Sequence, residues 1–452
     1  MILENVHVDG SLLAGFVERI MDMKLVIDNI SKIRHAEFEF RGITVIAGNN
    51  NTGKSTVGKV MFSAFNSLRN IGEKVERQRQ QQKMITLIRA LSNSESVNDD
   101  NIWMFLDLIK SSEGKDVQIW NFSNKQNFAE SLKKFLEKSG IKHIHLTEDL
   151  ISVIWEKIGS VDKVADSDVQ GMLIERVFKN IFDKQINSIT DDNKAKIELT
   201  IQKKKIGIEF ANNQCINVSI PIQLIHKAIL LQTPDSIHAF NNLDKRYRVY
   251  QHHIGLPEAY LIDFMKHAEN QTVIDEVENR KKLEDIYMLI HDVVPGQFTQ
   301  NENGEFVYRE TGYKEGLHLI NLSTGSKSFG MLSLILNHNV FTDEDVLILD
   351  EPEVHLHPEW QLKYAQMVIL LQKVFHLTIL LTTHSPYFLE AVEVYARKYG
   401  VDGITNYYMA RNQGNYAEFE EVTDDIDKIY QEMSEPFEHL DDLRLEMEMD
   451  KQ

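Results

Sequence analysis

The stretch from Gly42 to Phe62, GITVIAGNNNTGKSTVGKVMF, constrains the fold of this 452-residue chain more than any other. An apolar run, Thr44–Ala47, leads into the loop GNNNTGKS, which matches the pattern GxxxxGK[ST] in full. After the loop, apolar residues recur at helical spacing: Val57, Met61, Phe62, Phe65 and Leu68. A strand, a glycine-rich loop and a helix in this order predict an α/β fold that binds a nucleoside triphosphate.

The residue types of this loop indicate how it holds phosphate. Glycines let backbone N–H groups curl around the phosphates, and the start of the next helix adds a favourable dipole. We expect Lys54 to reach the β- and γ-phosphates and the Ser55 hydroxyl to bind Mg²⁺. The predicted nucleotide-binding residues of the loop are Gly48, Asn49, Asn50, Asn51, Thr52, Gly53, Lys54, Ser55 and Thr56.

Two further apolar runs end in polar residues. In DVLILDEPEVHLHP, Val346–Leu349 predicts a buried strand that delivers Asp350 and Glu351 at its carboxyl end, where α/β sheets bind ligands. We expect Asp350 to hold the Mg²⁺ shell and Glu351 to polarise the attacking water. In TILLTTHSP, a second buried strand ends in His384, which we expect to sense or orient the γ-phosphate.

A third feature, INLSTGSKS from Ile320 to Ser328, places small residues before a helical run. Alone, such a segment indicates a helix cap, but it can also hold an anion at a helix start.

Composition limits the class of protein. The chain has a net charge of −19, no apolar run near the roughly 20 residues of a membrane span, and one cysteine. These features predict a cytoplasmic protein without an internal disulfide or a cysteine-based zinc site. Residues 1–20 make a poor secretory signal, and Met21 and Met23 leave two interpretations of this leader: an added segment or a misassigned start.

Patterning along the chain divides it into segments. KIELTIQKKKIGIEFANNQCINVSIP alternates with period two and predicts an antiparallel meander, and KAILLQTP predicts another strand. We predict an N-terminal extension (1–22), an N-lobe with the phosphate loop (23–65), a helical insertion (66–190), the antiparallel part of the N-lobe (191–235), a short helical arm (236–292), a C-lobe (293–422) and an acidic amphipathic helix (423–452).

The order of phosphate loop, long insertion, LS-x-G-x-K, apolar-Asp-Glu and Thr-His-Ser resembles the ABC-type ATPase head. The version is that shared by SMC-like DNA-repair proteins and the OLD family, and it covers about Met23–Phe65, Lys196–Gln232 and Val293–Val422. The resemblance implies a parallel core sheet flanked by helices, an antiparallel β lobe and helical insertions. It also implies that two heads dimerise across two ATP molecules.

The same resemblance implies a role for single residues. Glu351 is the expected catalytic base, His384 the switch histidine and Lys54 a further catalytic residue. Ser323, Gly325 and Lys327 are expected to complete the ATP site of the partner copy. Gln232, at the end of KAILLQTP, is expected to bind Mg²⁺ together with Ser55 and Asp350.

Departures from the pattern narrow the class. Transporter heads usually have a small-residue turn after the paired acids, whereas this chain has Glu353-Val-His355-Leu-His357-Pro358, which is similar to OLD-type and anti-phage ATPases. His355 and His357 alternate on what reads as an extended segment, for which we favour a structural or dimer-interface role over metal binding. The acids Asp424, Asp425 and Asp427 fall on the helical pattern of the tail rather than at a strand end, so we expect no nuclease domain in this chain.

Such a head is similar to the ATPase subunits of two-component anti-phage systems. These pair the head with a separate nuclease, of HNH type in Septu, which we favour, or of Toprim type in PARIS. A DNA-repair ATPase and an ATP-binding scaffold with little turnover are the alternatives. The apolar stripe on the acidic tail suits either partner docking or packing on its own head.

Nucleic-acid contact would fall on the three dense basic spots, 203–205, 245–248 and 280–282, although such runs are usually solvated faces. We expect a dimer or a larger even-numbered assembly.

Overall fold

The computed structural model describes residues 23–92, 124–138, 146–242, 256–268, 281 and 283–449. These residues form two compact units, Asn70–Leu173 and the rest of the described chain. The predicted N-terminal extension lies outside the described residues, as do the basic residues 245–248, 280 and 282.

The larger unit is built on an 11-stranded sheet with the order β6-β5-β4-β1-β2-β14-β13-β3-β12-β11-β7. The last five strands of this order pair in parallel: β13 (Thr405–Gln413), β3 (Ile43–Ala47), β12 (Thr378–Thr383), β11 (Val346–Asp350) and β7 (Ala228–Leu231). All residues of β3, β7 and β12 are buried, as expected where helices cover both faces. The predicted α/β class with a parallel core is confirmed.

The other half of the sheet is the predicted antiparallel lobe. Its strands are β1 (Met23–Ile30), β2 (Ile33–Phe40), β4 (Ala195–Ile201), β5 (Lys204–Ala211) and β6 (Gln214–Ser219). Asn212 and Asn213 make the β5–β6 turn with φ of 51° and 60°, a conformation that asparagine tolerates. The strand β14 (Tyr416–Glu421) joins the lobe to the core, because it pairs with β13 and places Ala417 opposite Ile33 of β2.

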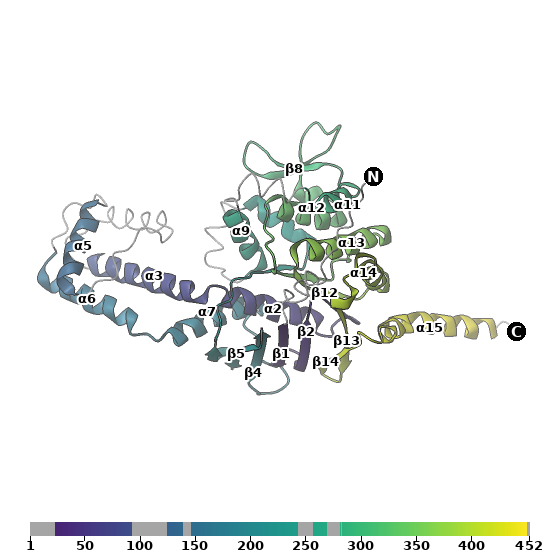
Figure 1. Cartoon of the computed structure of the whole chain (residues 1–452), viewed down its shortest axis with the longest axis horizontal. Coiled ribbons are helices and arrows are strands. Elements are labelled where there is room, and N and C mark those ends of the chain that lie inside the picture. Colours follow the sequence, from purple (N-terminus) through teal and green to yellow (C-terminus); the bar gives the residue numbers. More distant parts are fainter. Residues whose placement is uncertain are drawn as a thin grey trace, which may run out of the picture. The chain divides into compact units, whose positions relative to one another are not determined.

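Successive side chains of the core strands point to opposite faces of the sheet and pack into two separate hydrophobic cores. In β11, Leu347 and Leu349 join one core, whereas Val346 and Ile348 join the other. The helix α2 (Lys54–Leu68) packs in the second core. The first core includes residues of α12 (Thr324–Asn337), α13 (Pro358–Phe375) and α14 (Pro386–Tyr399), among other elements. Figure 1 shows β12 between α2 and the helices α13 and α14.

The region predicted as a short helical arm contains the 3-10 helix η2 (Pro234–Asn242), α9 (Pro257–Ala268) and α11 (Glu284–His291). Their apolar residues, among them Phe240, Leu261 and Ile286, belong to the first core. A small sheet, β10-β9-β8, follows with β8 (Gln297–Gln300), β9 (Phe306–Arg309) and β10 (Leu317–His318). These strands were not predicted, because runs of two to four residues are too short to show a period.

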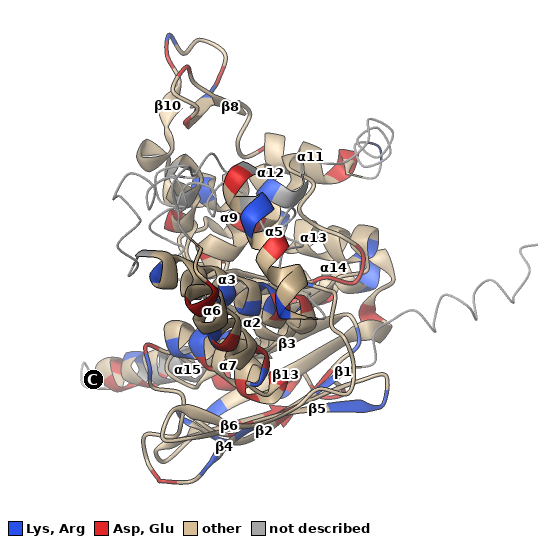
Figure 2. Cartoon of the chain, turned by 90° about the vertical axis from the view of Figure 1, so that its left-hand side faces the viewer, with Lys and Arg blue, Asp and Glu red and all other residues tan. Residues whose placement is uncertain are grey.

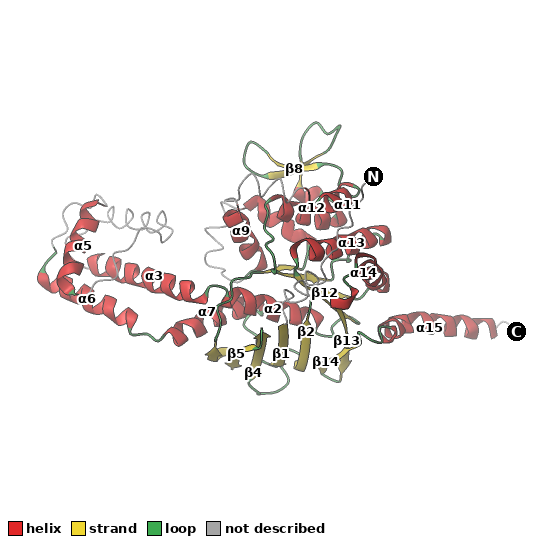
Figure 3. Cartoon of the chain, in the orientation of Figure 1, coloured by secondary structure: helices red, strands yellow, loops and turns green. Residues whose placement is uncertain are grey.

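The regular secondary structure of the described residues in the smaller unit is all helical, as predicted for the insertion (Figure 3). It contains α3 (Ile71–Ser92), α5 (Lys125–Lys138), α6 (Glu148–Asp162) and the beginning of α7 (Asp166–Ile181). Leu87, Leu132 and Ile154 form its own buried core with their neighbours.

The acidic tail forms α15 (Asp427–Met449). Ile429 and Met433 near its start are buried in the first core, whereas Leu440, Leu443, Met447 and Met449 are exposed. Asp424 and Asp425 lie in the turn that follows β14, so their predicted place on the helix was wrong. The helix begins only at Asp427, which lies in its first turn, where an acid is favoured by the helix dipole.

Lys203, Lys204 and Lys205 are exposed at the β4–β5 turn, where Lys205 pairs with Glu198 at 2.7 Å. Figure 2 shows Lys and Arg interspersed with Asp and Glu on the described elements. None of the helices in the described part of the chain is long and apolar enough to cross a membrane.

Candidate functional site

The phosphate loop connects β3 to α2 and is strongly curled. Gly48, Asn51 and Gly53 have φ of 152°, 65° and 82°. A Cβ added to Gly48 would lie 2.2 Å from the carbonyl oxygen of Ala410, so a side chain does not fit there. The Thr52 hydroxyl donates to the carbonyl oxygen of Asn49 at 2.8 Å and closes the loop. The loop therefore needs glycine at Gly48 for space as well as for conformation.

Lys54, the first residue of α2, is buried beneath the loop. Its ammonium donates to the carbonyl oxygens of Gly48 and Asn49, both at 2.8 Å. It also lies 3.3 Å from Glu351 Oε1. The loop thus holds a positive charge at its centre, in contact with the second of the two predicted acids.

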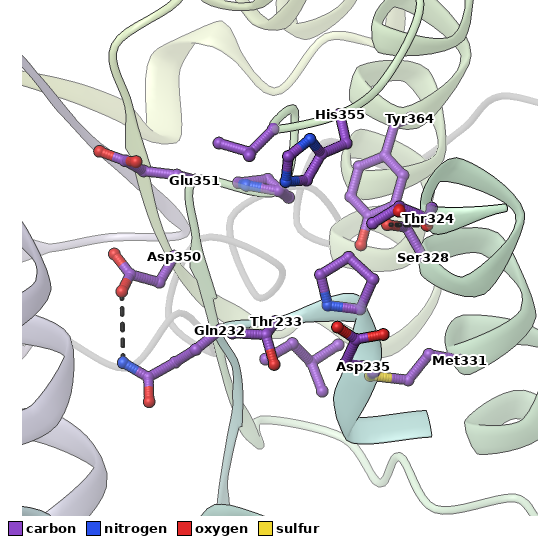
Figure 4. Close-up of a pocket in the computed structure, with 14 residues that line it drawn as sticks. Gln232, Thr233, Asp235, Thr324, Ser328, Met331, Asp350, Glu351, His355 and Tyr364 are labelled. Carbon is purple, nitrogen blue, oxygen red and sulfur yellow. Dashed lines mark hydrogen bonds between the residues drawn. The ribbon is translucent and has the colours of Figure 1, made fainter. Parts of the chain in front are cut away.

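Asp350 lies at the carboxyl end of β11, where three neighbouring side chains donate to it. Ser55 Oγ and Thr382 Oγ1 donate to Oδ1 at 2.9 Å and 2.6 Å. Gln232 Nε2 donates to Oδ2 at 3.3 Å (Figure 4). Because β7, β11 and β12 are adjacent and parallel, their ends bring Gln232, Asp350 and Thr382 to one edge of the sheet.

Glu351 follows with a left-handed backbone, φ 49°. Its N–H donates to the backbone oxygen of Thr382 at 3.1 Å and to the Thr382 hydroxyl at 3.0 Å. Its carboxylate lies between two groups, with Oε1 near Lys54 and Oε2 3.3 Å from His384 Nδ1. The structure therefore brings together the predicted residues Lys54, Glu351 and His384.

Three residues that hold these groups were not predicted from the sequence. Thr382 contacts Asp350 and Glu351, and Thr383 donates to Glu353 Oε1 at 2.6 Å. Glu353 is buried, and this burial raises its pKa. The threonines in the otherwise apolar TILLTTHSP were the sequence signal for these contacts, because a buried threonine needs a hydrogen-bond partner.

His355 and His357 do not lie on the extended segment that was predicted. His355 has φ 67° and is part of a turn, and His357 caps α13 by accepting from the N–H of Glu359 at 3.4 Å. The expectation of an extended strand was wrong, because Glu351 already turns the chain at the sheet edge. Among the described residues, no group of three or more His, Cys, Asp or Glu is arranged to hold a metal ion.

A cavity of about 300 Å³ borders the acidic edge. In Figure 4, Asp350 and Gln232 face each other on one side of it. His355 and Tyr364 lie with Thr324 and Ser328 of α12 on the other side. The start of α12 therefore lies close to the predicted metal-binding residues within the same chain.

Parts of the chain are similar to known proteins. Residues 174–390 match the family described as "AAA domain, putative AbiEii toxin, Type IV TA system". A curated relative, the Septu protein PtuA of Bacillus thuringiensis, is 25% identical over 145 residues. This match covers 28% of the present chain and 34% of that protein, about a third of its length.

The chain resembles a Septu-type ATPase of the SMC/OLD-like ABC class. Two similar solved structures are SMC heads. The SMC head domain from Thermotoga maritima is 11% identical with a TM-score of 0.35, covering 89% of this chain and 99% of that one. The Smc head of Pyrococcus furiosus, bound to the C-terminal domain of ScpA, is 10% identical with a TM-score of 0.38, covering 92% and 100%. The α/β fold class rests on the strand order and the phosphate loop described above.

The signature-like residues of this chain have partners within the chain itself. Ser323 caps α12 by accepting from the N–H of Ser326 at 3.2 Å. A Cβ at Gly325 would lie 2.9 Å from the Trp360 ring. Lys327 is largely buried and donates to Asp235 Oδ1 at 2.8 Å. The role of Ser323, Gly325 and Lys327 in completing the ATP site of a second copy stays a prediction.

The donor set at the sheet edge fits a hard divalent cation. Asp350 supplies carboxylate oxygens and Ser55 a hydroxyl. Gln232 points its amide nitrogen at Asp350, which leaves its carbonyl oxygen for a cation. Oxygen ligands of these types are those that Mg²⁺ prefers.

Proposed function

We propose that this chain binds ATP with Mg²⁺ and hydrolyses it. The proposal is supported by residues from distant parts of the sequence that meet at one sheet edge. Lys54 and Ser55 of the phosphate loop lie there beside Asp350 and Glu351, and Gln232 and His384 join them. A chance match to the loop pattern would not assemble a buried ammonium, a hydrogen-bonded aspartate and a glutamate–histidine pair.

The residues divide the work of hydrolysis. The loop N–H groups and Lys54 hold the phosphates of the substrate. Glu351 accepts a proton from the water that attacks the γ-phosphorus, and the bond to the β–γ bridging oxygen breaks to give ADP and phosphate. His384 orients the γ-phosphate beside Glu351. Mg²⁺, held by Ser55, Asp350 and Gln232, would neutralise charge on the phosphate oxygens.

We infer that two copies dimerise across two ATP molecules. Ser323 and Gly325 lie at the N-terminal end of α12, where backbone N–H groups favour an anion. In the proposed dimer, Ser323, Gly325 and Lys327 of one copy complete the site of the other. Larger assemblies would then contain an even number of chains.

The dimer is proposed to regulate a separate nuclease, of HNH type in the first place and of Toprim type in the second. Support comes from the likeness to a Septu protein and from the exposed half of α15. Leu440, Leu443 and Met447 recur at helical spacing there, among the acids Asp442, Glu446 and Glu448. We expect this surface to dock into an apolar groove with a basic rim on the nuclease subunit, because a second copy would bring like charges together.

Two variants test the ATPase proposal. Lys54→Ala removes the charge from the loop, and we expect it to abolish ATP binding. Glu351→Gln keeps the shape but not the base, so it should bind ATP and lose turnover by roughly 10²–10⁴-fold. Equilibrium binding of a fluorescent ATP analogue, phosphate release and light scattering measure binding, turnover and dimerisation. Normal hydrolysis by Glu351→Gln would contradict the proposed base.

The nuclease partner is tested by native affinity purification from the source cell with mass spectrometry. We expect a stoichiometric small protein with His/Asn or acidic nuclease motifs, whose binding is then measured with the purified components. A clean homo-oligomer whose hydrolysis is strongly stimulated by DNA would instead support a DNA-repair ATPase.

A further inference from the structure

Glu353 is the most conspicuous buried group that the proposed mechanism leaves without a role. Its carboxyl is 2% exposed and lies in the turn after β11. Oε1 accepts from the Thr383 hydroxyl at 2.6 Å and from the backbone N–H of His384 at 3.1 Å. The Thr383 hydroxyl accepts in turn from the N–H of Ser385 at 3.0 Å. One carboxyl oxygen thus ties the turn after β11 to the segment that carries His384.

The same oxygen also faces the His384 ring. His384 Nδ1 lies 3.6 Å from Glu353 Oε1 and 3.3 Å from Glu351 Oε2. Carboxylate oxygens accept hydrogen bonds, so this environment favours a proton on Nδ1. The ring is 39% exposed, and packing alone does not fix it. Both glutamates therefore lie where a carboxylate oxygen can accept from the ring N–H of the histidine.

Stability does not explain a glutamate at this position. Glu353 Oε2 is a buried oxygen without a hydrogen-bond partner among the described residues. An apolar residue of similar volume would avoid the cost of burying this group. Where a sequence keeps such a costly group, a functional role is the usual reason.

We propose that Glu353 is a positioning residue that holds His384 beside Glu351. The proposal rests on the proposed ATPase function, because His384 acts on the γ-phosphate of bound ATP. Among the described residues, the hydrogen-bond and ion-pair partners of the Glu353 carboxyl are Thr383 and His384, not Lys54 or the phosphate loop. Its loss should therefore lower kcat and leave the KM for ATP nearly unchanged.

The test compares Glu353→Met with Glu353→Gln, each in the wild-type and in the His384→Ala background. Methionine fills the site without an acceptor, whereas glutamine keeps an oxygen for Thr383 and His384. We expect Glu353→Met to lower kcat roughly 10–100-fold, the range seen when groups that orient a catalytic ligand are lost. Glu353→Gln should stay within about threefold of wild type, a change small compared with that range. In the His384→Ala background the Met substitution should have no further effect on kcat.

Two further variants separate position from folding. Asp345 is a buried acid just before the other end of β11, paired with Lys227 at 2.5 Å. Asp345→Asn should lower the melting temperature and leave kcat unchanged. If Glu353→Met does not fold, Thr383→Val removes one of the two hydrogen bonds at Oε1 and gives the same test.

The outcomes distinguish the two proposals. An equal loss of kcat with and without His384, or no loss at all, would overturn the role of Glu353 and leave the ATPase function standing. Wild-type turnover no higher than that of Lys54→Ala would overturn the ATPase function, and the role of Glu353 with it.

Discussion

Thr382 offers the sharpest test of the site, because its hydroxyl makes two hydrogen bonds there although Thr382 is not among the predicted site residues. Its hydroxyl donates to Asp350 at 2.6 Å and accepts from the N–H of Glu351 at 3.0 Å. The side chain is completely buried. Thr382→Val keeps the shape and removes both hydrogen bonds, so the effect reports on the hydroxyl rather than on a cavity.

The expected magnitude follows from the partners that remain. A hydrogen bond to a charged group contributes about 1.5–3 kcal/mol. Asp350 keeps Ser55 and Gln232, and Glu351 keeps the backbone oxygen of Thr382. The site should therefore be weakened rather than abolished. If the whole loss appears in the affinity for Mg²⁺ and ATP or in kcat, it corresponds to roughly 10- to 150-fold.

The assay measures kcat and KM for ATP over a Mg²⁺ titration, together with thermal denaturation without nucleotide. We expect a raised Mg²⁺ requirement and a melting temperature lower by a few degrees. Thr378→Val is the matched control, since Thr378 is a buried threonine at the opposite end of β12. Wild-type behaviour of Thr382→Val, or an equal loss of activity in Thr378→Val, would refute the reasoning.

Three other predictions follow from particular contacts. Gly48→Ala should displace the loop, because the new Cβ would meet the Ala410 carbonyl at 2.2 Å, and should abolish binding of a fluorescent ATP analogue. Gly159→Ala, where nothing lies within 4 Å, is its control and should fold at least as stably as wild type. Replacing Leu440, Leu443 and Met447 by serine should leave ATP turnover intact and remove the nuclease subunit in affinity purification, and retention of that subunit would exclude this docking surface. Burial raises the pKa of Glu353, so the cost of burying its charge is absent at low pH, and stability is lost as the pH rises through the folded-state pKa. Thermal melts from about pH 4 to about pH 8 should then show wild type losing stability relative to Glu353→Gln, and parallel curves would contradict this.

Contiguous patterns made most of the fold predictable. The strand before the phosphate loop is a short continuous apolar run, and α2 and the meander each carry a clear period within a short window. Strands that end in polar residues also predicted that Asp350 and His384 lie at one edge, because parallel strands share that edge, whereas Gln232 was expected there only from the resemblance to the ATPase head.

The residues that hold the site in shape were not predictable in the same way. Thr382 lies 32 residues from Asp350, and Glu353 lies 30 residues from Thr383. Lys327 is 92 residues from Asp235, with which it pairs. A local window does not contain such partners. His355 shows the opposite error, since an alternating pattern predicted extended backbone where tertiary contacts impose a turn.

The different surroundings of the two acids argue for different roles. Asp350 receives hydrogen bonds from two hydroxyls and an amide, all neutral, so its charge is held in place and left for a cation. Glu351 lies instead between Lys54, which the proposed mechanism places at the phosphates, and His384, which it places at the γ-phosphate. In the proposed ATP complex Lys54 contacts the phosphates, and Glu351 would lose a neutralising partner. Neighbouring carboxylates kept in unlike environments are the arrangement that lets one bind metal while the other moves a proton.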